Sequence, residues 1–469
     1  MTDINSFNVN GNRLVFELDG EEFIVKWPDE YNWGREHYDL MKDIALCAWS
    51  SKLAFTENTE PSVCFDASDD QIGFWLWIAY RINALDTYQT EGESEPFDFR
   101  EIKVETGSDT GSLIPRTLPD QEYEGALVCQ SPGKESVASR IIMEELGHEP
   151  IYSMFYEYPS RAATHKIQGR EDYEKVFDNP TRRVWSNTNT LQSTLQELTD
   201  NFEPVTCFWE IMYAMIATPI MVDHGLKWLM MGNQRDTGEA FQGDGYIAFE
   251  EINQSFIFEE AYSAYLTEEH DLPVRHTSNV RPYTGYGSRK IVARERPEFL
   301  QYMQNCIKPK PANKWCGTCY KCNNSWVEFL ACGIDPAEAG LDHDVLVENP
   351  HLGADQDDDW GFSFPRYARD EHVWKDEGGE EFFHEEVVDT LTEEQMEAFK
   401  IWRSRQEERV DEDDYQEMKE NNGVFIEPIA DALPDEVVDD IGLEHSDFVP
   451  EALDPNVWVG YSQEWRTFT

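Results

Sequence analysis

The sequence predicts an α/β protein, a parallel sheet with helices on both faces, preceded by a small β-rich region and followed by an acidic, mostly helical extension. Apolar stretches of strand length, near Leu127, Ile151 and Ile247, alternate with helical stretches, which favours a parallel sheet. A cysteine-rich segment ends this alternating part. From these changes in composition we divide the chain into residues 1–118, 119–335 and 336–469.

The N-terminal region begins with a predicted hairpin. Residues 13–18 and 23–25 alternate apolar and polar side chains, and an Asp-Gly pair between them favours a tight turn. A helix rich in aromatic residues is expected to follow. Residues 62–65 and the stretch after them predict another strand and a helix capped by Ser68 or Asp69.

The strand–loop–helix unit near residue 130 has the properties of a phosphate-binding site. Residues 126–130 are apolar, residues 131–136 read Ser-Pro-Gly-Lys-Glu-Ser, and an amphipathic helix follows as far as Gly147, a typical C-cap residue. The N–H groups of a first helical turn lack intrahelical partners. Together with the helix dipole, these groups attract anions. The alternative is an ordinary turn, because Ser, Pro and Gly favour turns in any case.

The 9 cysteines are distributed unevenly along the chain. Those isolated in apolar surroundings, which we expect in the core, are Cys47, Cys64, Cys129, Cys207 and Cys332. The remaining cysteines, whose spacing can close a tetrahedral zinc site, are Cys306, Cys316, Cys319 and Cys322. Because these ligands leave no open position, we expect structural Zn²⁺. An iron–sulfur cluster is the metal alternative, and disulfides are disfavoured in a cytoplasmic chain.

The formal net charge is −55, from 38 Lys and Arg against 93 Asp and Glu. The negative side chains repel one another in dilute buffer. Molar salt shortens the Debye length to about 3 Å and so screens this repulsion. The acidic residues are spread along the chain, which predicts a cytoplasmic protein of a salt-accumulating halophile or its virus. The charge argues against general nucleic-acid binding. No signal peptide or membrane span is expected, because charged residues and a proline interrupt the apolar residues 208–231.

Several short segments occur in a fixed order before the cysteine cluster. They are the loop at 131–136, Gly-Asn-Gln-Arg at 232–235, Asn-Gln-Ser-Phe at 253–256 and Asn-Val-Arg-Pro at 279–282. In this order they resemble the PP-loop ATP pyrophosphatases, and among them the family that includes UDP-N-acetylmuramoyl-L-alanyl-L-glutamate epimerase. The 7-cyano-7-deazaguanine synthases are a more distant resemblance that shares the loop and the four-cysteine site.

The resemblance implies an ATP-dependent, epimerase-like enzyme that adenylates a carboxylate of a small-molecule substrate and releases pyrophosphate. An acyl adenylate acidifies the adjacent Cα–H, so that a base can remove that proton. The residues implied for ATP are Ser131, Gly133, Lys134 and Ser136, with Glu135 helping to place Mg²⁺. The residues implied for the substrate are Asn233, Arg235, Gln254 and Arg281. Lys134, Glu135 and Arg281 are the implied catalytic residues.

Departures from the family pattern define the alternatives. Pro132 and Glu135 replace a glycine and an aspartate of the family loop, and Gln234 replaces an acidic residue. The alternatives are therefore a deazaguanine-synthase-like nucleobase-modifying enzyme and a non-catalytic binding or structural protein. The possible bases are His148, His165 and His276. The last segment, which contains Trp465, is too aromatic for a disordered tail and is expected to pack back on the core.

Overall fold

The computed structural model of the chain describes the greater part of residues 2–341 and short pieces of the remainder. The described ranges are 2–34, 37–56, 60–91, 95–107, 123–145, 147–157, 163–176, 181–234, 239–242, 246–249, 251–281, 285–304, 306, 315–317, 319–331, 334–341, 392–393, 397, 424–425 and 463–468. Most of the predicted helical extension, the boundary between residues 118 and 119, Cys332 and Arg235 lie outside these ranges.

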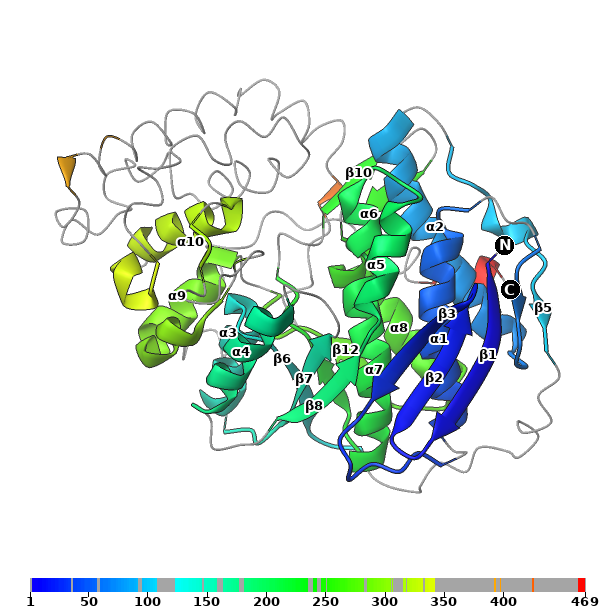
Figure 1. The fold of residues 1–469 in the computed structure, drawn as a ribbon, viewed down its shortest axis with the longest axis horizontal. Helices are drawn as coiled ribbons and strands as arrows, with labels where there is room; N and C mark the ends of the chain where they lie inside the picture. Colours follow the sequence, from blue (N-terminus) through cyan, green and yellow to red (C-terminus); the bar gives the residue numbers. More distant parts are fainter. Residues whose placement is uncertain are drawn as a thin grey trace.

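Within the described residues, ten strands form one continuous, mostly parallel sheet in the order β12-β9-β6-β7-β8-β3-β2-β1-β4-β5 (Figure 1). One half of it is entirely parallel. The strands of this half are β6 (Ala126–Gln130), β7 (Ile151–Glu157), β8 (Arg182–Ser186), β9 (Trp228–Met230) and β12 (Arg275–Thr277). The predicted parallel sheet is therefore confirmed, with strands at Leu127 and Ile151 as expected.

The order of the parallel strands creates a switch point between β6 and β9. From β6 the chain adds β7 and β8 on one side, and then returns to add β9 and β12 on the other. Ligands of open α/β sheets bind at the carboxyl edge at such a point, because the connections leave the two central strands toward opposite faces. The predicted phosphate loop follows β6, and residues 231–234 follow β9, so both lie at this edge.

Helices cover both faces of the parallel strands (Figure 1). On one face α3 (Lys134–Glu145) packs on β6 and against α9 (Gly285–Glu295). On the other, α7 (Phe208–His224) contacts β6 and β9, and α8 (Phe256–Glu268) contacts β12. The apolar stripe of α3 is buried, and Gly147 caps the helix at φ +72° while His148 N–H donates to the Met143 carbonyl at 3.0 Å.

The N-terminal strands extend the same sheet. The predicted hairpin is formed by β2 (Arg13–Leu18) and β3 (Glu21–Lys26). Asp19 at φ 51° and Gly20 at φ 87° make the tight turn that suits the twist of a hairpin. β3 then pairs antiparallel with β8, and β1 (Asp3–Asn10) continues the sheet outward, followed by β4 (Ser62–Val63) and β5 (Glu105–Thr106). The region predicted as 1–118 thus shares its sheet with the parallel half.

The apolar core joins the N-terminal helices to the sheet. α1 (Tyr38–Leu53) packs against both α7 and α2 (Asp69–Glu91), and the Ser68 hydroxyl caps α2 by accepting from Gln71 N–H at 2.9 Å. Among the described residues, one helical stretch, Pro204–His224, is long and apolar enough to cross a membrane, with a mean hydropathy of 1.5. Its most apolar window is 78% buried inside the protein, which is typical of a core helix.

A buried carboxylate, Asp43, ties three core helices together. It accepts hydrogen bonds from Trp75 Nε1 at 2.9 Å and Tyr265 OH at 2.7 Å, and His270 Nε2 lies 2.7 Å from its other oxygen. Burial alone would raise the pKa of Asp43, but His270 and these donors outweigh it and hold that pKa below its usual value. The charge is therefore paired inside the core.

The described C-terminal residues, 463–468, pack back on the core, as predicted. Trp465 is 1% exposed, and the centroid of its ring lies 5.9 Å from the ring centroid of Phe74 and 6.0 Å from that of Tyr265. Glu464 accepts from Trp77 Nε1 at 3.0 Å and pairs with the buried Arg81. The end of the chain therefore contributes to the core formed by α2 and α8.

Two expectations from the sequence are wrong. The strand at Ile247, β11 (Ile247–Phe249), does not join the parallel sheet, because it pairs antiparallel with β10 (Glu239–Gln242). β10 also pairs with β13 (Val424–Phe425), which completes a small separate sheet. Cys64 is exposed rather than buried, because β4 ends at the preceding residue, whereas Cys47, Cys129 and Cys207 are buried as expected.

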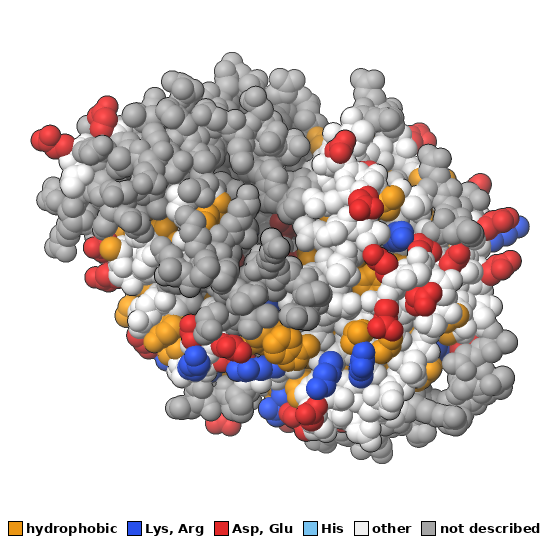
Figure 2. All heavy atoms as spheres, in the orientation of Figure 1, with side chains coloured by type: hydrophobic (Ala, Val, Ile, Leu, Met, Phe, Trp, Pro, Cys, Tyr) orange, Lys and Arg blue, Asp and Glu red, His pale blue; other side chains and the backbone are white. Residues whose placement is uncertain are grey.

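The surface is acidic. Figure 2 shows acidic side chains spread over the described part of the visible face, with fewer basic ones among them. Because the net charge of −55 is screened as the Debye length falls from about 10 Å at 0.1 M to 3 Å at 1 M salt, we expect KCl to raise the melting temperature by several degrees over this range. Thermal unfolding measured in a KCl series tests this expectation, and a melting temperature that stays constant or falls would contradict it.

Candidate functional site

Segments that are far apart in the sequence meet at the carboxyl edge of β6, β9 and β12. We call this the switch-point site, defined by residues 131–136, 231–234, 252–255 and 278–281. A Cβ atom at Gly232 would lie 2.9 Å from Glu135 Cβ, so the glycine allows the second segment to approach the first. Asn279 Nδ2 donates to the Ser139 carbonyl at 3.0 Å, which attaches the last segment to α3.

Residues 131–136, which we call the phosphate loop after their predicted role, are closed into a turn by their own hydroxyl groups. Ser131 Oγ accepts from Gly133 N–H at 3.1 Å and lies 3.0 Å from Ser136 Oγ. The Gly133 carbonyl accepts from Val137 N–H at 3.1 Å, so the loop leads directly into α3. Ser131, Gly133 and Ser136 are half-buried, and they lie at the N-terminus of a twelve-residue helix, a favourable position for an anion.

Lys134 and Glu135 form an ion pair in this loop. Lys134 Nζ lies 2.8 Å from Glu135 Oε1, and the two side chains are 13% and 23% exposed. Burial alone would lower the pKa of Lys134, but the carboxylates of Glu135 and Glu328 outweigh it and raise that pKa. Burial alone would raise the pKa of Glu135, but the charge of Lys134 outweighs it and lowers that pKa. Both side chains are therefore charged at neutral pH.

The expected substrate residues have protein partners in the structure. Arg281 is 2% exposed, donates from Nη1 to the Gln234 carbonyl at 3.0 Å and pairs through Nη2 with Glu259 at 2.5 Å. Asn233 is 1% exposed and donates to the same Glu259 carboxylate at 2.8 Å. The Gln254 carbonyl accepts from Arg281, and its side chain is half-buried. These contacts make Arg281 and Asn233 a scaffold of the site, and a substrate contact by either stays a prediction.

Of the histidines predicted as possible bases, neither His276 nor His148 is placed to act as one at this site. His276 lies in β12 and is 2% exposed, and burial together with Arg281 lowers its pKa to about 3. His148 is exposed and precedes β7, so it lies at the amino edge, opposite the phosphate loop. The side chain of His165 lies outside the described residues.

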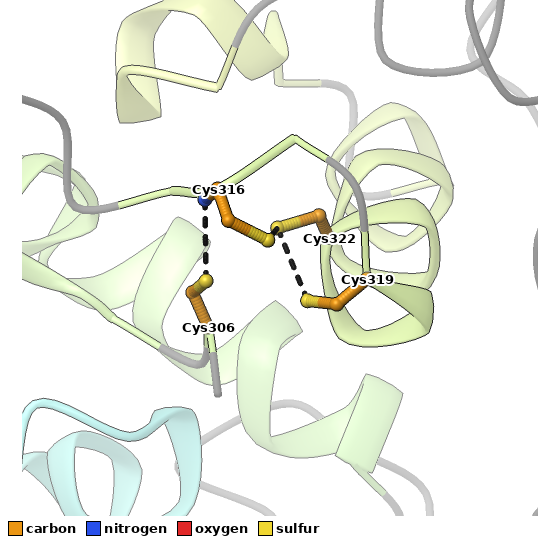
Figure 3. Close-up of side chains that lie close together, drawn as sticks. All are labelled: Cys306, Cys316, Cys319 and Cys322. Carbon is orange, nitrogen blue, oxygen red and sulfur yellow. Dashed lines mark hydrogen bonds between the residues drawn. The ribbon is translucent and has the colours of Figure 1, made fainter. Parts of the chain in front are cut away.

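The four cysteines Cys306, Cys316, Cys319 and Cys322 are brought together as predicted (Figure 3). All are buried, and their sulfur atoms lie within 4.8 Å of one another. Cys322 Sγ lies 3.8 Å from Cys316 Sγ and 3.5 Å from Cys319 Sγ. Gly317 adopts φ 70°, which makes the turn between the ligands. The group is positioned to bind a metal ion.

We call the four cysteines, Gln304 and residues 320–331 the cysteine module, and it lies against the phosphate loop. Gln304 lies two residues before Cys306, and its backbone N–H donates to the Pro132 carbonyl at 2.8 Å. The buried Arg289 of α9 donates to Glu328 at 2.6 Å, which joins α9 to α10 (Tyr320–Ala331), the helix that carries Cys322. The charge of Glu328 in turn raises the pKa of Lys134. The module therefore contacts the loop and acts on the charge of Lys134.

Two charged residues of this region are not apparent from the sequence. The charge of Lys321, between two of the cysteines, acts on both Glu135 and Glu210, and for Glu210 it opposes the rise in pKa that burial causes. Glu210, in the first turn of α7, accepts a hydrogen bond from Asn253 Nδ2. A helix that begins at the carboxyl edge of the sheet is the signal that could have pointed to Glu210, because its first turn faces that edge.

Comparisons of the chain with protein-family models, with curated proteins and with solved structures each return no match.

Proposed function

We propose that the chain binds Mg·ATP at the switch-point site and adenylates a carboxylate of a small-molecule substrate with release of pyrophosphate. The observation that carries this proposal is the position of residues 131–136 and 231–234 after β6 and β9, the two strands that flank the switch point. The sequence resemblance to the PP-loop enzymes assigns the same segments to ATP and substrate.

The chemistry of the loop supports a nucleotide polyanion as its ligand. Ser131 and Ser136 offer hydroxyl groups, Gly133 allows close approach of the backbone, and Lys134 supplies a positive charge. Lys134 would offset the charge that grows on the departing pyrophosphate. Glu135 would exchange its contact with Lys134 for Mg²⁺, which prefers carboxylate and phosphate oxygens.

We further propose that the cysteine cluster holds structural zinc. In a tetrahedral site with Zn–S distances of about 2.3 Å the sulfur atoms are about 3.8 Å apart, and two of the sulfur pairs in the protein are 3.8 and 3.5 Å apart. All the ligands come from the protein, so the metal has no open position for substrate. Its role would be to order the module that contacts the loop.

The proposal is tested by calorimetric titration with Mg·ATP and by ATP–pyrophosphate exchange with a set of carboxylic acids, among them amino-acid derivatives. We expect saturable binding of one nucleotide per chain and exchange that depends on the acid, because adenylation is reversible. If the protein binds Mg·ATP but none of the acids supports ATP–pyrophosphate exchange, the non-catalytic alternative is favoured. Absence of nucleotide binding at physiological ATP concentration and high KCl would contradict the proposal.

A further inference from the structure

Glu210 lies at the same edge of the sheet as the phosphate loop. It is in the first turn of α7, which runs from the carboxyl edge back toward the start of β9. Glu157, the last residue of β7, lies at this edge too, and its charge acts on Glu210. The charge of Lys321 acts on both Glu210 and Glu135. Topology and electrostatics therefore place Glu210 beside the switch-point site.

Asn253 connects Glu210 to the scaffold of the site. Its Nδ2 donates to the Glu210 carboxylate, and the carbonyl of the next residue, Gln254, accepts from Arg281. Asn253 is 3% exposed, and its Oδ1 has no partner among the described residues. An amide donates to a carboxylate and, after rotation, accepts from a carboxylic acid. Asn253 can therefore hold Glu210 in either protonation state.

The surroundings of Glu210 suit proton transfer near neutral pH. Burial raises the pKa of Glu210 to about 7, against the opposing effects of Asn253 and Lys321, and Glu157 adds to the rise. The side chain is half-buried, so it is not sealed inside the core. A base with a pKa near the working pH is the most effective for general base catalysis.

We propose that Glu210 is the catalytic base of the switch-point site and removes the proton from the carbon next to the activated carboxylate, an inference that rests on the proposed function. In this step the Cα–H bond breaks and an O–H bond forms on the Glu210 carboxylate. The electron pair of the C–H bond moves into the enolate of the acyl adenylate. When the proton returns to the carbon, the carbonyl is restored and Glu210 is again a carboxylate.

The substitution Glu210→Gln tests this role, because it keeps the shape and the contact with Asn253 but cannot accept a proton. The probe is N-acetyl-L-glutamate with Mg·ATP in D₂O, and deuterium at Cα is measured by mass spectrometry beside ATP–pyrophosphate exchange. We expect deuterium incorporation to fall by about 10²–10⁴-fold, with pyrophosphate exchange retained. In the parent protein incorporation should rise with pH through about 7, and the variant should lose this rise.

Asp223→Asn is the matched control, because Asp223 is an exposed carboxylate in the last turn of the same helix, at the opposite edge of the sheet. It should leave both activities unchanged. Deuterium incorporation that Glu210→Gln retains would overturn the assignment, and so would pyrophosphate exchange by the parent protein without deuterium incorporation. Absence of pyrophosphate exchange in the parent protein would instead overturn the proposed function, and this inference with it.

Discussion

Replacing Lys134 with alanine should weaken Mg·ATP binding by roughly 10- to 100-fold, the loss expected for one hydrogen bond to a charged group. Lys134 is the first residue of α3, and its ammonium lies 2.8 Å from the Glu135 carboxylate. Without the lysine, Mg²⁺ alone would offset the repulsion between that carboxylate and the triphosphate, and like charges repel strongly where water is partly excluded. The variant therefore loses an attraction and gains a repulsion at the same position.

Pyrophosphate release should decrease more than binding does, by about 10²–10³-fold, because the lysine offsets charge that develops only in the transition state. Calorimetric titration and pyrophosphate release measure the two effects separately. Lys175→Ala is the control, since Lys175 is 68% exposed and lies after α4 (Ala163–Glu174), away from the loop. A Lys134→Ala protein with the nucleotide affinity of the parent would remove the loop from the proposed ATP site.

Local rules explain the elements that the sequence predicts correctly. The hairpin turn needs positive φ at two successive positions, and Asp19-Gly20 is a pair that supplies it. The cap at Ser68 depends on a hydroxyl group at the start of the helix, and the cap at Gly147 on the positive φ that glycine adopts just after the helix end. The four cysteines are recognisable because metal ligands must lie close together in space. Their short separations along the sequence already bring them near one another.

Features that depend on distant parts of the chain are not predictable in this way. β9 and β12 have three residues each, so their apolar pattern is too short to separate them from adjacent helices, although they form one side of the switch point. Arg281 and Asn233 have the residue types of ligand-binding groups, but both contact Glu259, which lies on α8, a separate element of the chain. The pKa of Glu210 depends on burial and on charges from other elements, which no local pattern contains.

The cysteine module also contacts the phosphate loop and holds α10 against α9. Gln304 N–H holds the Pro132 carbonyl of the phosphate loop, and the ion pair of Arg289 with Glu328 fixes α10 against α9. Both contacts come from elements next to the cysteines. Since a structural metal supplies folding free energy to the segment that binds it, loss of the metal should disorder these contacts as well as the module.

The substitution Cys319→Ser should therefore abolish metal binding and nucleotide binding together. We expect about one zinc per chain in the parent protein and almost none in the variant, because removal of one thiolate leaves an incomplete tetrahedral site. Structural zinc contributes about 10–16 kcal/mol in small zinc-binding peptides, so the module should unfold and become sensitive to proteolysis. Elemental analysis, limited proteolysis and Mg·ATP titration measure the three effects.

Cys64→Ser is the matched control, because Cys64 is exposed and lies outside the cluster. It should keep the metal content, protease resistance and nucleotide affinity of the parent protein. Strong visible absorbance with iron in place of zinc would identify an iron–sulfur cluster, which uses the same ligands. A Cys319→Ser protein that loses its metal but binds Mg·ATP as the parent does would show that the loop keeps its geometry without the module, and would refute the coupling.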